Sequence, residues 1–454
     1  MENTSLRGFP GSAPFPRPPR LGAAGPARLV PLFALLAAPF CVPVQVQALA
    51  IDGSSALDQF RDAYRLIRER YVTPPGDFKL IDGAIKGLVK GLDPHSEYLD
   101  AQGFRTLQEE ALGQFGGLGV QVAMEQGLLK IVRAIPQSRA AKSGLRPGDI
   151  ILRLNDQPIT GLTISQAVAR MRGPVDSMVR VAIRRKDQSA PIEMLVARDP
   201  IRVDTVSSRI VSGNVGYIRI TQFNDLTTEG LQRALEDIWA RVPGIRLKGF
   251  VLDLRNNPGG LLEQAISVSK AFLDSGTIVS IYGRNIEDNK TYVTSVSGGD
   301  LGRDRPLIVL INGGSASAAE IVAGALQNNA RATVLGTRSF GKGSVQSIWP
   351  IGGGAALKLT TGLYYTPSGR SIQAKGITPD IEVMQKGRES QTPVTHSEAA
   401  LANHLKIDGD EQTGSDTFIP SDPKYDKALQ MAIDLLQGTK THRAFPAGQS
   451  SVPN

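Results

Sequence analysis

The sequence of 454 residues is poor in the side chains that cross-link chains and hold metals. It has one cysteine, Cys41, and four histidines. A single cysteine excludes an intrachain disulfide framework and a zinc site built on cysteines. Four histidines leave little room for a histidine metal centre, or for a catalytic triad in which histidine is the base.

The chain also lacks a large excess of charge. Its 51 basic and 43 acidic side chains give a net charge of +8, of which the first 50 residues supply +3. The remaining excess is mild and scattered, so we expect no nucleic-acid partner. Hydrophobic residues make up 41% and charged residues 21%, which excludes wholesale disorder. The length predicts two to four domains.

Residues 1–50 have the layout of a secretory signal peptide. A leader rich in Pro, Gly and Arg precedes an apolar run at residues 29–46, which ends in the small-x-small pattern Ala48-Leu49-Ala50. We therefore expect export and cleavage. An uncleaved membrane anchor is the alternative, although prolines inside the run disfavour a spanning helix. After cleavage the chain contains no cysteine, which suits an oxidising compartment.

Residues 51–112 are expected to be helical. Apolar residues recur at helical spacing at positions 57–71 and 81–89, and the sequence Asp-Pro-His-Ser at 93–96 then breaks the pattern. We interpret His95 as a satisfied loop or core residue, because a lone histidine rarely has the partners of a catalytic base.

Residues 113–200 read as short strands around one helix at 163–171. The motifs Gly-Leu-Gly-Val at 117–120 and Leu-Arg-Pro-Gly-Asp-Ile-Ile at 145–151 resemble those of a PDZ domain. In such a loop, backbone N–H groups converge on one carboxylate, and the adjacent sheet edge accepts a peptide as an extra strand. The alternative is a hairpin turn that needs glycine for a positive φ. The expected peptide-binding residues are Gly117, Leu118, Gly119, Val120, Val168 and Met171.

Residues 201–385 alternate strands and helices, which predicts an α/β core with at least partly parallel strands. Expected strands lie at 215–220, 249–254, 307–311, 334–336 and 357–365, and expected helices at 231–239, 261–273 and 317–326. Residues 386–454 should hold one helix at 425–436, with a disordered tail from Gly438. Helices at 55–71 and 425–436 are candidate self-association elements.

Four stretches of the core carry possible chemistry. The first, residues 253–261, has the sequence Asp-Leu-Arg-Asn-Asn-Pro-Gly-Gly-Leu, a strand that enters a glycine-rich turn before a helix. Backbone N–H groups exposed at such a turn stabilise negative charge. The pattern matches neither a P-loop nor Gly-x-Gly-x-x-Gly, so we expect no nucleotide site.

The second stretch, residues 312–320, is Asn-Gly-Gly-Ser-Ala-Ser-Ala-Ala-Glu. A serine at such a strand-to-helix turn exposes its hydroxyl, and the next N–H can face a developing oxyanion. Ser317-x-x-Glu320 also matches a capping box, so Ser317 is either a nucleophile or a helix cap. Ser315 is an equal contender for the nucleophile.

The third stretch, residues 339–346, is Ser-Phe-Gly-Lys-Gly-Ser-Val-Gln. Burial of Lys342 would lower the pKa of its amine toward neutrality, so that it could accept a serine proton. Gln346 could orient that amine. The alternative is a surface lysine in a loop. The fourth stretch, residues 366–380, reads as turns without derivable chemistry.

These motifs in this order resemble the carboxy-terminal processing proteases, also called tail-specific proteases, over residues 55–385. The resemblance implies a ClpP/crotonase-like α/β protease core with an inserted PDZ domain and an N-terminal helical region. It implies Ser317 as nucleophile, Lys342 as base and Gln346 as its assistant. It implies an oxyanion hole of the Ala318 N–H with Gly260, or alternatively Gly259.

By the same resemblance, the chain is an exported serine endopeptidase of the bacterial periplasm. It would capture apolar C-terminal tails of proteins, use no metal or organic cofactor, form oligomers and work with a lipoprotein adaptor. One departure is Asn328, where many family members carry Asp; a Ser/Lys/Gln mechanism does not need that acid.

Two other functions stay open. One is a PDZ binding or adaptor protein on an inactive protease scaffold, which the joint presence of Ser317, Lys342 and Gln346 disfavours. The other is a crotonase-type acyl-CoA enzyme, which the export signal and the PDZ unit disfavour.

Overall fold

The computed structural model describes residues 53–295, 299–385 and 396–445. The expected signal peptide at residues 1–50 lies outside this range. The chain divides into two compact units, one ending at Pro74 and the other beginning at Pro75. Within the described ranges, no helix combines the length and apolar character needed to cross a membrane.

The N-terminal region is helical, as expected. The first unit contains α1 (Gly53–Arg70), and the second begins with α2 (Asp77–Lys90). A short strand β1 (Glu97–Leu99), which was not predicted, and a third helix α3 (Ala101–Leu112) follow; α3 lies within the region expected to be helical, but its bounds were not predicted. The sequence signals of α3 lie at its ends: the Asp100 carboxylate accepts a hydrogen bond from the Gly103 N–H, and Gly113 closes the helix at φ 65°.

The second unit contains the predicted PDZ fold. One sheet has the order β3-β4-β5-β7-β8, with β6 paired to β5, so β3 is an edge strand. Helix α5 (Ile164–Met171) begins at a capping box of Thr163 and Gln166. The other elements are β3 (Val120–Glu125), β4 (Leu128–Ala134), α4 (Arg139–Lys142), β5 (Ile150–Leu154), β6 (Gln157–Pro158), β7 (Met178–Arg184) and β8 (Ile192–Ala197). An antiparallel ribbon of β2 (Gln114–Gly117) and β9 (Asp199–Arg202) joins this domain to the chain on either side.

The protease-like core is built on a six-stranded sheet of order β10-β11-β12-β15-β16-β19. Its pairs are parallel except for β10 with β11, as the alternation of strands and helices predicted. The strands are β10 (Val206–Val211), β11 (Val215–Ile220), β12 (Gly249–Asp253), β15 (Leu307–Ile311), β16 (Thr333–Gly336) and β19 (Ile381–Glu382).

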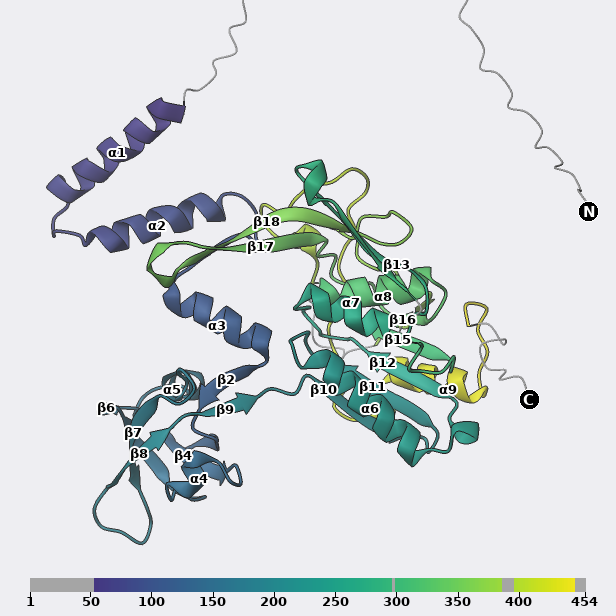
Figure 1. Ribbon diagram of the computed structural model, residues 1–454, viewed down its shortest axis with the longest axis horizontal. Helices are drawn as coiled ribbons and strands as arrows, with labels where there is room; N and C mark the ends of the chain where they lie inside the picture. Colours follow the sequence, from purple (N-terminus) through teal and green to yellow (C-terminus); the bar gives the residue numbers. More distant parts are fainter. Residues whose placement is uncertain (1–52, 296–298, 386–395, 446–454) are drawn as a thin grey trace, which may run out of the picture. The chain divides into compact units, whose positions relative to one another are not determined.

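Helices cover both faces of this sheet (Figure 1). On β12, Phe250 and Leu252 pack against helices on one face, while Val251 between them packs against α9 on the other. Both faces being buried explains why β12 and β15 are continuous apolar runs. The helices are α6 (Thr227–Arg241), α7 (Leu262–Lys270) and α8 (Ala318–Asn328) on the first face and α9 (Lys427–Gln437) on the second.

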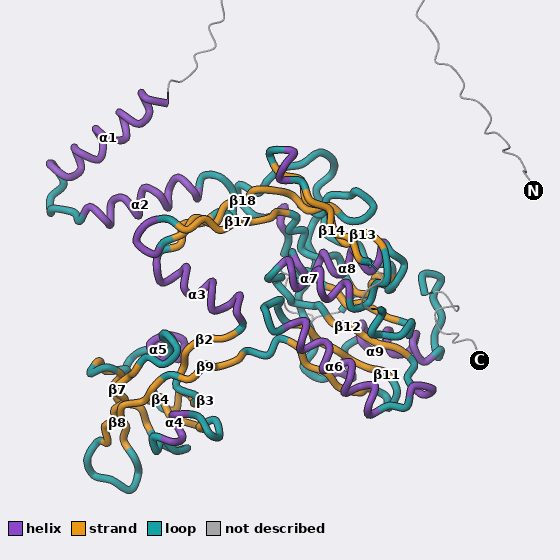
Figure 2. Tube along the Cα trace, in the orientation of Figure 1, coloured by secondary structure: helices purple, strands orange, loops and turns teal. Residues whose placement is uncertain are grey.

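A second, antiparallel sheet has the order β1-β18-β13-β14, and β17 pairs with β18. Figure 2 shows β17 and β18 as a long hairpin. Because β1 pairs with β18, the loop carrying the Asp-Pro-His-Ser motif is brought to the strands that follow Lys342. The remaining strands are β13 (Gly276–Gly283), β14 (Lys290–Thr294), β17 (Ser344–Pro350) and β18 (Ala356–Tyr365).

The C-terminal segment is more ordered than the sequence predicted. Helix α9 matches the expected helix at 425–436, but its apolar face packs on the core sheet, so it is not a self-association face. The expectation of disorder from Gly438 is wrong as far as Phe445. Phe445 is 8% exposed and lies in the same buried cluster as Leu436. One buried aromatic anchors this segment, and a single residue produces no periodic pattern.

Candidate active site

Ser317 lies at the sharp turn between β15 and α8. Its φ of 54° and ψ of −115° place it in a conformation that serine rarely adopts. Such a strained strand-to-helix turn exposes a nucleophile. The turn is pressed against Gly259, where a Cβ atom would lie 2.8 Å from the Cβ of Ser317. The strain and the close approach distinguish position 317 from an ordinary helix start and make Ser317 the candidate nucleophile.

The two serines of this turn differ in how their hydroxyls are used. The fully buried Ser315 hydroxyl donates to the Leu254 carbonyl (2.9 Å) and accepts from the Asn312 N–H (3.0 Å). The predicted pairing of Ser317 with Glu320 is present, but its hydrogen bond runs from the Ser317 amide to the Glu320 carboxylate (2.8 Å). The capping box brings the Ser317 hydroxyl close to the backbone N–H of Glu320, but that N–H donates to the Ser317 carbonyl (2.8 Å), and the hydroxyl donates its own proton to no acceptor among the described residues.

Glu320 ties the serine turn to the lysine loop. Its Oε2 accepts from the backbone N–H of Ser317 (2.8 Å) and of Lys342 (2.9 Å). Its Oε1 accepts from the Gly341 N–H (2.7 Å) and the Ser339 hydroxyl (2.5 Å). Burial raises the pKa of Glu320 to about 7, although all of these hydrogen bonds favour the ionised form. One carboxylate therefore fixes the backbone of both candidate catalytic residues.

Lys342 has the environment that the sequence predicted. Burial, together with the positive charge of Lys358, lowers the pKa of its amine from the ordinary value to about 8; Glu398, Glu320 and Asp93 oppose this effect. Within the described ranges, the amine forms neither a hydrogen bond nor an ion pair with another side chain. A lysine with a pKa near 8 is neutral often enough to accept a proton at physiological pH.

The Gln346 side chain is oriented by its neighbours. Its Nε2 donates to the Ser344 hydroxyl (2.9 Å) and to Thr360 Oγ1 (3.2 Å). Thr360 in turn donates to Asp93 Oδ1 (3.1 Å), which comes from the Asp-Pro-His-Ser motif. These hydrogen bonds orient the amide nitrogen of Gln346 toward Ser344 and Thr360. They leave Oε1, the atom able to accept a hydrogen bond from an amine, without a partner among the residues described. The predicted contact between Gln346 and Lys342 stays a prediction.

The two glycines proposed for the oxyanion hole, Gly259 and Gly260, differ in whether their N–H groups are free. The Gly259 N–H donates to Asn257 Oδ1 (2.9 Å). The N–H groups of Gly260 and Ala318 donate to no described acceptor. Gly260 has a φ of 140°, and a Cβ there would lie 2.0 Å from the Phe223 carbonyl oxygen, so only glycine fits. Two free N–H donors are the requirement of an oxyanion hole.

Asn328 lies far from this chemistry along α8. It is the last residue of an 11-residue helix whose first turn follows Ser317, a length of about 16 Å. Its side chain accepts a hydrogen bond from the Ser368 N–H (3.3 Å). Among the described residues, Asn328 makes no side-chain hydrogen bond with Ser317 or Lys342.

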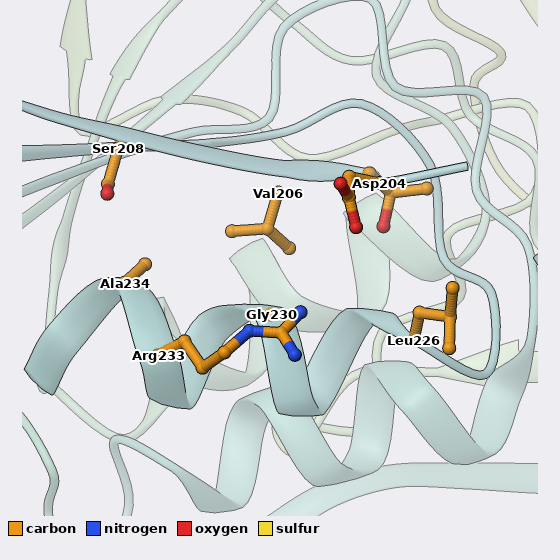
Figure 3. Close-up of a pocket in the computed structure, with 8 residues that line it drawn as sticks. Asp204, Val206, Ser208, Leu226, Gly230, Arg233 and Ala234 are labelled. Atoms are coloured by element: carbon orange, nitrogen blue, oxygen red, sulfur yellow. The ribbon is translucent and has the colours of Figure 1, made fainter. Parts of the chain in front are cut away.

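A pocket between β10 and α6 contains none of these residues (Figure 3). Asp204 and Ser208 line one side of it and Arg233 the other. No group among its lining residues has the environment of an activated nucleophile or base, so we do not assign it to the reaction.

The PDZ residues named from the sequence gather around one small core. Leu118 and Met171 are buried, at 2% and 5% exposure, and Val120 and Val168 pack against the same cluster. Gly119 has a φ of 70°, the positive value that the hairpin-turn alternative needs, so the carboxylate-binding role of this loop stays a prediction. The loop therefore leads into the edge strand β3 and lies against α5.

Thr360→Val is expected to lower kcat about fivefold, because Gln346 loses one of the two acceptors that orient its amide. Removing one positioning hydrogen bond is worth about 1 kcal/mol. Cleavage rates measured at substrate saturation test this. Thr361→Val is the matched control, because Thr361 shares a hydrogen bond only with Ser347 (2.7 Å) in the described part of the chain. Equal rates for the two variants would contradict the assigned role of Thr360.

Comparison with known proteins identifies the family of this chain. Residues 214–383 match peptidase family S41, residues 130–185 match the PDZ domain, and residues 44–103 match the "activating protease CtpB N-terminal domain". The chain is 48% identical over 400 residues to the carboxy-terminal-processing protease of Bartonella bacilliformis, covering 87% of this chain and 92% of that protein.

It is also 35% identical over 372 residues to the carboxy-terminal processing protease CtpB of Bacillus subtilis, covering 81% and 75% of the two chains. Among solved structures, the photosystem II D1 C-terminal processing protease aligns with 25% identity and a TM-score of 0.42, over 72% of this chain and 93% of that one. The chain thus belongs to the carboxy-terminal processing proteases of peptidase family S41 that carry a PDZ domain, and it is a serine-type peptidase.

Proposed function

We propose that the protein cleaves other proteins near their C-terminal tails, with Ser317 as nucleophile and Lys342 as general base. The observation that carries this proposal is the bridge made by Glu320, whose Oε2 accepts from the backbone N–H of both residues. The bridge holds the two backbones together and engages neither reactive side chain. The lowered pKa of Lys342 supports its part as base.

The reaction then follows in two halves. The neutral Lys342 amine takes the proton of the Ser317 hydroxyl as the oxygen attacks the peptide carbonyl carbon. The N–H groups of Gly260 and Ala318 hold the oxyanion. When the C–N bond breaks, the Lys342 ammonium returns its proton to the leaving amine. Water, activated by the same lysine, hydrolyses the acyl-enzyme. Gln346 Oε1 accepts a hydrogen bond from the lysine and so orients it.

The PDZ domain supplies the substrate preference. The loop of Gly117, Leu118, Gly119 and Val120 binds the free carboxylate, and Val168 and Met171 of α5 contact an apolar last side chain. The tail pairs with β3, which is available because it lies at the edge of its sheet. The substrates are therefore proteins with apolar C-terminal tails.

The protein acts outside the cytoplasm. The signal-like pattern of residues 1–50 supports export to the periplasm of a bacterial envelope, where a lipoprotein adaptor delivers substrates. Self-association would use α1, which carries exposed apolar side chains such as Leu57 and Leu66.

The test compares wild type with Ser317→Ala on a protein bearing an apolar C-terminal tail, with fragments followed by mass spectrometry. We expect cleavage near the tail by wild type, loss of at least about 10³-fold in the variant, and weaker cleavage when the tail carboxylate is amidated. Equal cleavage by both proteins would remove Ser317 from the mechanism. Tail binding without any product would favour the alternative, an adaptor on an inactive scaffold.

A further inference from the structure

A second buried carboxylate, Glu398, lies beside the lysine loop. It belongs to the 3₁₀ turn η4 (Glu398–Ala400) in the C-terminal segment and is fully buried. Its Oε2 is 2.7 Å from Nε2 of His95, and its Oε1 accepts from Gln373 Nε2 (2.9 Å). Its backbone N–H donates to the Phe340 carbonyl (3.0 Å). A carboxylate with no access to water is here held entirely by protein donors.

Gln373 carries this contact to the residue after Lys342. Its Oε1 accepts a hydrogen bond from the Gly343 N–H (3.0 Å). The approach is so close that a Cβ on Gly343 would lie 2.2 Å from the Gln373 backbone nitrogen. The backbone N–H groups of residues 341–343 thus donate hydrogen bonds to two different sides. Glu320 binds the N–H groups of Gly341 and Lys342, and Glu398 binds that of Gly343 through Gln373.

The negative charge of Glu398 also acts on the Lys342 amine. The charges that act on the Lys342 amine are those of Lys358 on β18, Glu398 on η4, Glu320 on α8 and Asp93 in the loop before β1. Lys358 opposes the protonated amine, and the three carboxylates favour it. Glu320 reaches the lysine backbone directly, through the N–H of Lys342, and Glu398 reaches it from the other side, through Gln373 and the N–H of Gly343.

We propose that Glu398 is a positioning residue for Lys342, acting through Gln373 on the backbone and through its own charge on the amine, with His95 as its buried partner. The proposal rests on the Ser/Lys mechanism above. It assigns a task to the histidine of the Asp-Pro-His-Ser motif and to the C-terminal segment, neither of which takes part in that mechanism.

The charge part is tested by the pH dependence of kcat/KM. Because Lys342 must be neutral to act as base, activity rises with pH through the pKa of its amine. Glu398→Gln removes a negative charge that favours the ammonium, so the pKa of the Lys342 amine falls. The rising part of the pH profile, its acid limb, then shifts to lower pH. Lys358→Gln removes a positive charge and shifts the limb to higher pH. A merely structural role would lower activity and leave the limb in place.

The matched control is Glu411→Gln. Glu411 also pairs with a histidine in the C-terminal segment, His404 (2.9 Å), and it is not among the charges that act on Lys342. We expect its acid limb to coincide with that of wild type. If the acid limb of Glu398→Gln coincides with that of wild type while the limb of Lys358→Gln is shifted, the charge part of the proposal is overturned.

The effect on the backbone is tested by Gln373→Leu, which removes the hydrogen bonds to Gly343 and Glu398 without changing the charge. This variant tests the proposal even if Glu398→Gln fails to fold. We expect kcat to fall by about ten- to a hundredfold with KM unchanged, since a displacement of about 1 Å costs that much. Unchanged kcat would overturn it. If Lys342→Met retains both activity and the acid limb, the Ser/Lys mechanism itself fails, a result distinct from either outcome above.

Discussion

Lys342→Met is expected to abolish cleavage and to make the protein more stable. General-base catalysis contributes about 10²–10⁴-fold, so we expect a loss of about 10³-fold or more in kcat. The gain in stability follows from the lysine's burial, which lowers the pKa of the folded state to about 8, below its ordinary value. Below that pH the folded protein holds a charged amine in a poorly hydrated site, a cost of up to about 3 kcal/mol.

The sign of the pH dependence provides the check. The destabilisation by Lys342 is fully present below about pH 8 and disappears as the pH rises toward the ordinary lysine value, where the amine is neutral in both states. The variant should therefore exceed wild type in urea unfolding at pH 7 by about 1–3 kcal/mol, and the difference should shrink above pH 10. A variant that is less stable at pH 7, or that still cleaves, would contradict the description of Lys342 as a buried base.

Asp426→Ala is expected to destabilise the protein by about 3–5 kcal/mol, because it leaves a buried guanidinium partly unpaired. Arg255 is 5% exposed and forms two hydrogen bonds with Asp426, both 2.8 Å, in addition to those with Asp253. Asp426 Oδ1 also caps α9 through the Leu429 N–H (3.0 Å). Since Arg255 begins the turn that leads to Gly260, we expect cleavage to fall as well.

Urea unfolding of Asp426→Ala beside Asp422→Ala measures this. Asp422 is a few residues earlier in the same segment and caps a turn as well, but its ion pair with Lys424 is exposed. Exposed pairs contribute about 0–1 kcal/mol, so the control should lose little. Similar losses in both variants would show that the buried network around Arg255 contributes no more than a surface cap.

The parts of the site that lie within one short motif were readable from the sequence. The turn at Ser317 and the loop at Lys342 each combine small residues with one reactive side chain, and the structure has the sharp turn and the lowered lysine pKa that these patterns predicted. Glu320 was read as part of a helix cap. Its main task, to bind Ser317 and Lys342 at once, joins two distant stretches and leaves no mark in local spacing.

The same reason explains what was missed elsewhere. Glu398, Gln373 and Asp426 act through single long-range polar contacts, which have no periodicity. In the second sheet, β18 was expected at 357–365, whereas β1, β13, β14 and β17 escaped prediction for a related reason. β17 alternates poorly because much of it is exposed, and β1 has three residues. The parallel sheet was predicted well, since burial on both faces made its strands continuous apolar runs.

The contact between His95 and Glu398 spans 303 positions of the chain. A ribosome that has made the serine turn and the lysine loop has not yet made Glu398, nor Asp426 beyond it. The newly synthesised chain therefore contains the Lys342 loop before it contains the carboxylate that binds Gln373 and the helix α9 that completes the core. It follows that a copy ending before residue 398 would lack both this carboxylate and the helix α9 that covers one face of the core sheet, and we expect it to be less stable and to cleave more slowly than the full chain.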